Sequence, residues 1–451
     1  MSGPATELYE QIKSDPIVSP HGHCDPSWFA TDAAFPNPSE LLVTPDHYVF
    51  RMLYSQGVSL QDLGIGQATL KEPRQVFRIF AEHWELFLGT PSHLWITHVL
   101  EDTLGVPTKL TPQKADAVYD QIEALLKQDA FKPRALYDRF QIEVLATTDS
   151  AVDPLTAHAD IAKGSWPGRV IPTFRPDSVL DPLHPDFAKD LGLLEERTQI
   201  QLNSFEDFLS ALRNRRAYFQ ANGATATDHA IERLWTEWLS PTECEHLFEQ
   251  ARRGTITTMQ AARFYGHMLI EMAQMSLEDG LVMQMHCGSR RNTNTQVFQQ
   301  FGRDKGADIP RATDWVHGLE NLLNRAGNNP ELTLILFTLD ETSYARELAP
   351  MAGHWPALRI GPPWWFHDSV AGIARYFDQV VETAGYFNLA GFNDDTRAFL
   401  SIPARHDLWR RCVAIHLANQ IQRGFFDRTD AERLAQLLST ELARKTYRLE
   451  T

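Results

Sequence analysis

The sequence predicts an α/β protein built as a (β/α)8 barrel, and three observations support this fold class. Eight short segments rich in branched and aromatic residues recur along the 451-residue chain. Segments with helical spacing of apolar residues lie between them. Nearly every strand-like segment ends in a polar or charged residue followed by a turn. Such barrels build their active sites from the carboxyl ends of the strands.

The predicted strands occupy residues 16–23, 140–149, 168–177, 223–230, 280–288, 332–340, 357–365 and 386–395. The side chains expected at the barrel mouth are His23, Asp149, Arg175, Asp228, His286 and Asp395. In the first strand His21 and His23 are two residues apart, so both imidazoles would face the same side.

Helices are predicted between the strands and at the end of the chain. Residues 369–385 form one, since Val370, Ile373, Tyr376, Phe377 and Val380 recur at steps of three and four. Residues 429–445 form the last, and Thr429 with Glu432 makes a capping box at its start.

The first connection is too long for a plain barrel, because residues 26–139 separate strands one and two. Within it, residues 111–128 have helical spacing, with Thr111 as cap and Pro112 in the first turn. We therefore expect residues 26–139 to form a mostly helical insertion over the barrel mouth. The barrel and its C-terminal helices would then comprise residues 1–25 and 140–451.

Composition limits the partners and the compartment. The net charge of −16 opposes binding to nucleic acid or acidic membranes. No apolar stretch of 18 residues is present, and the N-terminus lacks the basic-then-apolar order of a secretory signal. Four scattered cysteines without Cys-x-x-Cys spacing argue against disulfides and a thiolate zinc site. A cytoplasmic protein is predicted, and its oligomeric state, a homo-oligomer included, is left open.

The His21 and His23 pair becomes a metal-site candidate only with a third ligand, since 17 histidines produce such pairs by chance. Asp395 is the predicted third ligand, because it ends strand eight, which lies beside strand one in a closed barrel. An equally consistent alternative is that Asp394 and Asp395 cap the following helix. Two metals are not expected, because Asp228 and Thr338 or Asp340 stand where a bridging lysine and another histidine would be needed.

Other polar residues suggest an anionic ligand. His286 is followed by a loop with Gly288, two arginines and two asparagines, a polar density typical of ligand sites. Arg51, Arg175, Arg291 and Arg397 are predicted to clamp a carboxylate and sugar hydroxyls. Trp364 would form a wall against the apolar face of a sugar, with core packing as the alternative.

Seven longer motifs follow one another along the chain. They are DHYVFRMLYSQGV (46–58), TTDSAVDPLTAHADIAKG (147–164), IPTFRPD (171–177), ATDHAIE (226–232), HCGSRRNTNT (286–295), WWFHD (364–368) and DDTRAFLS (394–401). Over nearly the whole chain they resemble the uronate isomerase, or glucuronate isomerase, family of the amidohydrolase superfamily.

This resemblance implies one divalent metal ion, Zn²⁺, held by His21, His23 and Asp395, and no organic cofactor. It also implies that the substrate contacts Tyr48, Arg51, Arg175, Asp228, His286, Arg291, Trp364 and Arg397. One departure is visible, because Gly22 stands where family members often have cysteine between the two histidines.

The implied reaction interconverts an aldouronate and a ketouronate, either D-glucuronate with D-fructuronate or D-galacturonate with D-tagaturonate. Moving a hydrogen between C2 and C1 by a proton route requires a base and an electrophile. The predicted catalytic residues are Asp395 for a hydroxyl proton, Tyr48 or His286 nearer the carbonyl, and Asp228. The competing hypotheses are a mononuclear zinc hydrolase of a small anionic amide or lactone and a non-catalytic sugar-acid-binding barrel.

Overall fold

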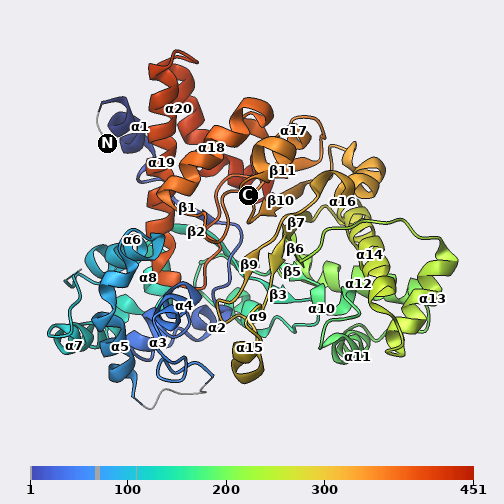
Figure 1. Cartoon of the computed structure of the whole chain (residues 1–451), viewed down its shortest axis with the longest axis horizontal. Coiled ribbons are helices and arrows are strands. Elements are labelled where there is room, and N and C mark those ends of the chain that lie inside the picture. The colour runs from blue at the N-terminus through green and yellow to red at the C-terminus, as the bar shows by residue number, and fades with distance from the viewer. Residues whose placement is uncertain (1–2, 67–71, 108, 451) are drawn as a thin grey trace.

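The centre of the molecule is a set of parallel strands whose order in space follows the chain (Figure 1). The structure is a computed structural model that describes residues 3–66, 72–107 and 109–450. The parallel strands are β1 (Ile17–Ser19), β2 (Ile142–Ala146), β3 (Asp149–Ser150), β4 (Val170–Ile171), β5 (Phe174–Arg175), β6 (Ala226–Ile231), β7 (Val282–Cys287), β10 (Leu334–Thr338) and β11 (Leu358–Ile360). β8 (Ser289–Arg290) and β9 (Ile309–Pro310) form a separate antiparallel pair.

The second and third predicted strands are each interrupted, so the ladder is divided into two sheets. One has the order β1-β2-β4 and the other β11-β10-β7-β6-β5-β3. Since β2 and β3 follow each other in one stretch, as do β4 and β5, the two sheets continue one another. Between them the Thr147 N–H donates to the carbonyl oxygen of Ile171 at 2.9 Å. Seven of the eight predicted strands are thereby confirmed.

The eighth predicted strand, residues 386–395, is wrong as a regular strand. Residues Tyr386–Asn388 form a 3₁₀ turn, and one parallel bridge joins Leu389 to Ile360 of β11. On the other side the His23 N–H donates to the carbonyl oxygen of Thr396 at 3.0 Å. The segment still occupies the eighth position between β11 and β1, but it does so with isolated contacts in place of a ladder.

The strands place alternate side chains in different cores, as period-two geometry requires. In β10, Ile335 and Phe337 belong to an inner cluster that also contains Val18 and Val282 from other strands. Leu334 of the same strand packs in the larger outer cluster with the surrounding helices. The inside of the strand ring is therefore filled by side chains, as in a (β/α)8 barrel.

Helices surround this ring (Figure 1). Those following the strands are α9 (Thr156–Lys163), α10 (Asp177–Leu180), α11 (Phe187–Thr198), α12 (Phe205–Ala221), α13 (Pro241–Arg252), α14 (Thr258–Asp279), α15 (Thr295–Phe301), α16 (Trp315–Leu322), α17 (Ala349–Ala352) and α18 (Val370–Ala384). The chain ends are α1 (Pro4–Ile12), α19 (Ile402–Gln422), α20 (Arg428–Gln436) and α21 (Leu442–Thr446). Figure 1 shows α1 beside α19 and α20, so the N-terminal helix packs against helices from the C-terminal part of the chain.

The predicted insertion is helical in its described part, and residues 67–71 and 108 lie outside that part. Its helices are α2 (Pro26–Thr31), α3 (Pro38–Leu42), α4 (His47–Ser55), α5 (Pro73–Glu82), α6 (Pro91–His98), α7 (Ala115–Leu126) and α8 (Pro133–Arg139). Their apolar faces share a cluster with Ile17, Leu145 and Val170 of the neighbouring strands. The division of the chain into barrel and insertion stays a prediction.

Two predicted helix starts are wrong. α7 begins at Ala115. The residues before it form a turn, in which the carbonyl oxygen of Thr111 accepts the Lys114 N–H. α20 begins at Arg428, because the Asp427 carboxylate accepts the Asp430 N–H and thus outcompetes Thr429 as cap. The predicted helix at 369–385 is confirmed as α18, although Val370 in its first turn is exposed.

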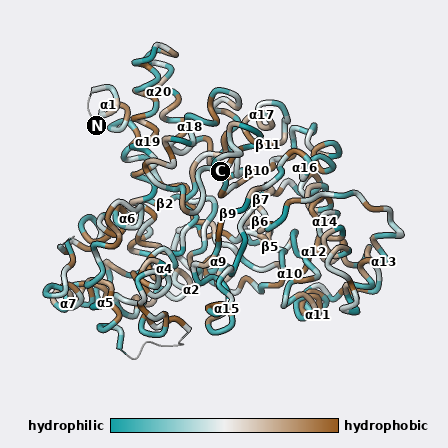
Figure 2. Tube along the Cα trace, viewed as in Figure 1, coloured by the Kyte–Doolittle hydropathy of each residue, from teal (hydrophilic) through white to brown (hydrophobic). Residues whose placement is uncertain are grey.

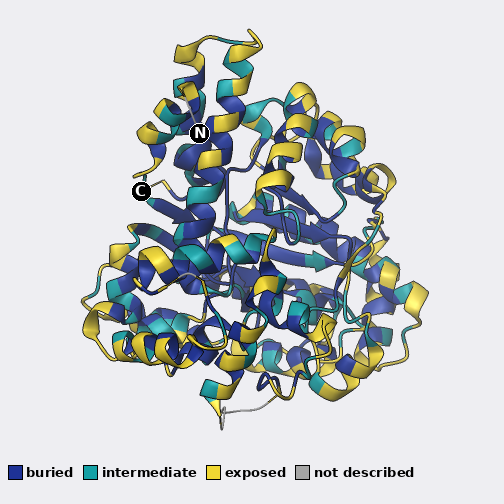
Figure 3. Cartoon of the chain, turned by 60° about the vertical axis from the view of Figure 1, so that its left-hand side comes forward, coloured by how far each residue is buried: buried dark blue, intermediate teal, exposed yellow. Residues whose placement is uncertain are grey.

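Burial follows the same layers. Figure 3 shows dark blue strands inside an outer layer of helices with yellow faces, and Figure 2 shows brown and teal residues alternating along those helices. All four cysteines are free and buried, as predicted. Among the described residues, the helices are all too short or too polar to cross a bilayer.

Candidate active site

A cavity at the carboxyl ends of the strands collects most of the predicted site residues. It encloses about 750 Å³ not filled by protein atoms, counting the part open to solvent. The predicted residues lining it are His21, His23, Tyr48, Arg175, Asp228, His286, Arg291, Trp364, Asp395 and Arg397. Arg51 is not among them. Asp149, expected at the mouth, instead accepts the hydroxyl hydrogen of Thr147 at 2.7 Å.

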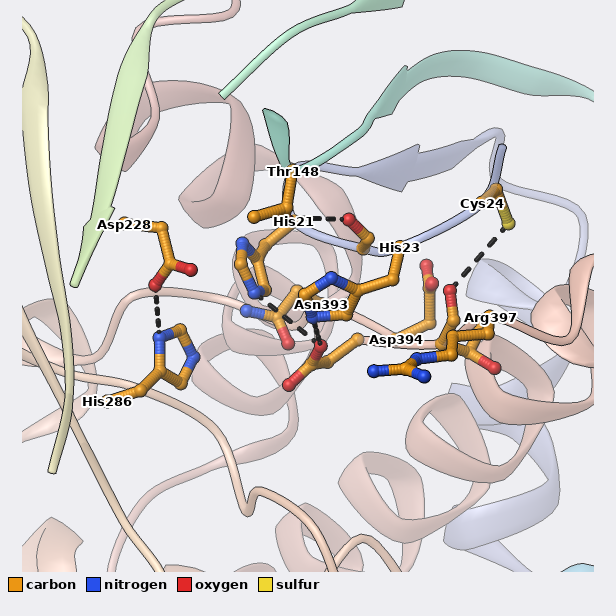
Figure 4. A network of polar contacts seen from close by, with 12 residues as sticks. His21, His23, Cys24, Thr148, Asp228, His286, Asn393, Asp394 and Arg397 are labelled. Atoms are coloured by element: carbon orange, nitrogen blue, oxygen red, sulfur yellow. Dashed lines mark hydrogen bonds and ion pairs between the residues drawn. The ribbon is translucent and has the colours of Figure 1, made fainter. Parts of the chain in front are cut away.

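The end of β1, the end of β7 and the eighth segment supply a compact group of histidines and a carboxylate, and Figure 4 labels the three histidines His21, His23 and His286. Nε2 of His21 lies 3.5 Å from Oδ1 of Asp395, and Nε2 of His23 lies 3.0 Å from the same oxygen. One metal-binding atom from each of His21, His286 and Asp395 lies within 4.8 Å of the others. The helical turn after Asp395 begins at Phe399 and α19 at Ile402, so the alternative that Asp394 and Asp395 cap a helix is wrong.

The protonation states of this group suit a cation. Burial lowers the pKa of His21 to about 4, so its imidazole is neutral at pH 7. Burial acts to raise the pKa of Asp395, but His21 and His23 hold it well below its ordinary value, and the group is a carboxylate. Nε2 of His286 is buried without a hydrogen-bond partner in the described structure. Neutral imidazoles and a carboxylate are the donors that Zn²⁺ and similar ions prefer, so these residues fit a divalent metal.

His286 is oriented by its neighbours. Its Nδ1 donates to Oδ1 of Asp228 at 2.6 Å, which leaves a lone pair on Nε2 facing the cavity. The ring stacks on Phe337 with centroids 4.1 Å apart, and Trp364 packs against it edge-on at 4.7 Å. Arg175 and His286 hold the pKa of Asp228 well below its usual range in spite of burial, which keeps this acceptor charged.

Tyr48 on α4 has two hydrogen bonds that fix its hydroxyl. The hydroxyl donates to Oδ1 of Asp368 at 3.1 Å and accepts the Phe366 N–H at 3.1 Å. Arg405 in turn donates to Oδ2 of Asp368 at 2.8 Å, and its guanidinium lies 3.5 Å above the ring of Trp95. A phenol has one hydrogen and two lone pairs, so one lone pair of Tyr48 remains for a ligand in the cavity.

The predicted arginines fall into different environments. Arg175 donates from Nε to Asp177 at 2.8 Å and lies 3.2 Å from Oδ2 of Asp228. Arg291 and Arg397 reach the cavity from loops, whereas the guanidinium of Arg51 lies 4.7 Å above the ring of Phe366. Three of the four predicted arginines thus line the cavity, and Arg291 and Arg397 have longer ion pairs than Arg175. The clamp itself stays a prediction.

Several lining residues were not predicted as site residues: His47, Asp304, Gly306, Pro363, Trp365, Asp368, Asn393 and Asp394. His47 and Asp368 stand inside or at the end of motifs that held predicted residues, which was an available signal. Burial lowers the pKa of His47 to about 3, and its ring meets Trp365 edge-on at 4.8 Å. Asp304 lies in a loop without any motif, so the sequence offered no signal for it.

Comparisons with known proteins all point to one family. A profile of the family described as glucuronate isomerase matches residues 1–445. A uronate isomerase of Rhizorhabdus wittichii is 53% identical, with 99% of this chain and 95% of that protein covered. The crystal structure of glucuronate isomerase from Caulobacter crescentus superposes with a TM-score of 0.97 at 49% identity, covering 99% and 94% of the two chains. A uronate isomerase structure from Thermotoga maritima, 24% identical with 98% and 97% covered, shares the fold at a TM-score of 0.93.

Proposed function

The chain belongs to the glucuronate isomerase family, and from this premise we propose how its cavity carries out the reaction. The protein is a uronate isomerase, an intramolecular aldose–ketose isomerase. We propose that it interconverts D-glucuronate with D-fructuronate, or D-galacturonate with D-tagaturonate. The observation that supports a catalytic site best is the group formed by His21, His286 and Asp395 in a cavity that Arg175, Arg291 and Arg397 also line.

The proposed metal ligands are His21, His23 and Asp395. The metal, Zn²⁺ in this proposal, would supply a positive charge that stabilises negative charge developing on substrate oxygens. The neutral ring of His21 and the charged carboxylate of Asp395 are already in the protonation states that ligation requires. We propose no organic cofactor, because the reaction needs only proton transfer.

The remaining polar groups handle protons and orientation. The carboxylate of Asp395 accepts the hydroxyl proton released as the sugar ring opens. Nε2 of His286 has a free lone pair and can accept a proton near the carbonyl. Burial raises the pKa of the Tyr48 hydroxyl well above its ordinary value, so this hydroxyl stays protonated and its free lone pair accepts a hydrogen bond from a substrate hydroxyl. Asp228 keeps His286 in the tautomer with its hydrogen on Nδ1, and Trp364 closes the wall beside that ring.

The proposed function is tested by incubating the purified protein with each uronate and following ketose formation. We expect turnover that a chelator abolishes and added Zn²⁺ restores. Uronate binding without any ketose after long incubation would instead support a binding protein. A product heavier by one water would support the hydrolase hypothesis, which none of the observations on the cavity favours.

The route of the hydrogen has its own test. A base at the cavity predicts that reaction in D₂O places solvent deuterium in the product. Complete retention of substrate hydrogen would contradict the proton route and favour a hydride shift.

A cytoplasmic location remains part of the proposal and is supported by the composition of the chain.

A further inference from the structure

The cavity arginines already face carboxylates of this chain. Arg175 is held by Asp177 and Asp228, which are both largely buried. Nη1 of Arg291 lies 3.4 Å from Oδ2 of Asp308. A uronate carboxylate entering the cavity therefore does not meet unpaired positive charge, and it must compete with an anion that the chain supplies.

Most of these carboxylates are fixed in place. Asp177 accepts the Ala230 N–H at 3.1 Å in addition to Arg175. Asp228 accepts from His286. Asp308 is 1% exposed and accepts the Asn292 N–H at 2.7 Å. Displacing any of them would leave a buried charge without its hydrogen bonds, which is costly.

Asp304 differs from these carboxylates in its exposure and in the length of its ion pairs. Its side chain is 42% exposed, and its two carboxylate oxygens lie 3.5 Å from Nη1 of Arg291 and 3.8 Å from Nη2 of Arg397. Both distances exceed the roughly 2.7–2.9 Å of a charge-assisted hydrogen bond. Burial opposes the charge, but Arg397 and Arg291 hold the pKa of Asp304 below its ordinary value. The carboxylate is thus charged, loosely held and shared by the two arginines most suited to bind a ligand.

We propose that Asp304 is a displaceable counter-ion, which holds Arg291 and Arg397 before substrate binds, competes with the substrate carboxylate for them, and so sets the affinity for the acid. This inference rests on the proposed function, because it assigns the uronate carboxylate to those two arginines. A ligand with its own carboxylate compensates the arginines when Asp304 turns to solvent. A neutral sugar leaves Asp304 with its arginines and is little affected, so Asp304 lowers the affinity for acids selectively and eases their release.

The test replaces the charge while keeping the shape, as Asp304→Asn. We expect the KM for D-glucuronate to fall about two- to tenfold, the range that two half-exposed ion pairs supply, with kcat retained. The inhibition constant of the uncharged analogue D-glucuronamide should change less than twofold. Glu232→Gln is the matched control, because Glu232 is similarly exposed at 44% and pairs with Arg311 outside the cavity lining. Its KM should stay unchanged, which separates a local effect from the overall negative charge.

Combined variants distinguish failure of the proposed carboxylate site from failure of the counter-ion role of Asp304. Arg397→Ala should raise the KM, and adding Asp304→Asn to it should bring back little of the affinity, because the shared partner is gone. If Arg291→Ala and Arg397→Ala both leave the KM unchanged, the carboxylate site of the proposed function is wrong. A thermal unfolding curve is used to show that the Asp304→Asn protein is folded. The counter-ion role is wrong if the arginine variants raise the KM but Asp304→Asn leaves it equal or higher. An equal gain for the uncharged amide would also overturn it.

Discussion

The two sides of the cavity are built in different ways. We call His21, His286, Asp228 and Asp395 the floor, and Arg291, Arg397 and Asp304 the rim. In the floor, the hydrogen bond between His286 and Asp228 is 2.6 Å long and both side chains are at most 4% exposed. In the rim, the pairs with Asp304 span 3.5 and 3.8 Å, and each side chain is at least one third exposed.

From this contrast we propose that the floor serves the chemistry and the rim serves recognition of the substrate. Catalytic groups gain most from preorganised, buried positions, where their orientation does not change during reaction. Charged groups that admit and release a substrate must be able to exchange partners. We therefore expect substitutions in the floor to lower kcat and substitutions in the rim to change KM.

The largest effect is expected for the floor residue shared by both histidines. Asp395→Ala removes a proposed metal ligand and a proton acceptor, so kcat should fall by about 10³-fold or more and the bound metal should be lost. Metal content and turnover are measured on the same sample. Asp340→Asn is the control, since this carboxylate at the end of β10 binds Thr342 and does not line the cavity. Full metal content with undiminished turnover in Asp395→Ala would contradict the assignment.

The next largest effect is expected for two further lining residues, Tyr48 and Asp368, which share a hydrogen bond. Tyr48→Phe and Asp368→Asn should each lower kcat about 10²-fold with little change in KM, because the first removes the hydroxyl that contacts the reacting ligand and the second removes the acceptor that orients it. The double variant should be no slower than the slower single variant, since the two groups act together. Losses that multiply would show that the residues work independently.

The floor and the two arginines of the rim could be predicted from the sequence, whereas Asp304 and the partners of Tyr48 could not. His21, His23 and His286 stand at the ends of apolar strands, where period two fixes the side to which they point. The partners of Tyr48 could not be found in this way, because Asp368 lies 320 residues further along the chain. Asp304 depends on how the loop between β8 and β9 folds, and no local periodicity encodes that. The eighth strand was predicted wrongly for a related reason. Its residue types favour extended backbone, but they do not determine whether that backbone pairs regularly with its neighbours.

In the rim, Arg397→Ala should raise the KM for a uronate about tenfold and leave kcat within about threefold. The loss of one charge-assisted hydrogen bond in a half-exposed position accounts for this size. Raising the ionic strength should weaken binding in the parent protein and less so in the variant, because salt screens exposed charges. Arg433→Ala on α20 removes an exposed arginine paired with Glu441 and serves as control. A drop in kcat with constant KM would place Arg397 in the floor.

The smallest effect tests whether the rim loop positions α4. Gly302 and Gly306 both have positive φ, so alanine is strained at either position by roughly 1–3 kcal/mol. A Cβ at Gly306 would lie 2.7 Å from Cβ of Arg51 on α4, whereas a Cβ at Gly302 would meet nothing within 4 Å. Both variants should therefore lose stability in denaturant unfolding. Only Gly306→Ala should also lower kcat/KM, by a few-fold, because α4 carries His47 and Tyr48 into the cavity. If Gly302→Ala lowers kcat/KM equally, strain within the loop is responsible, and its contact with α4 does not couple rim to floor.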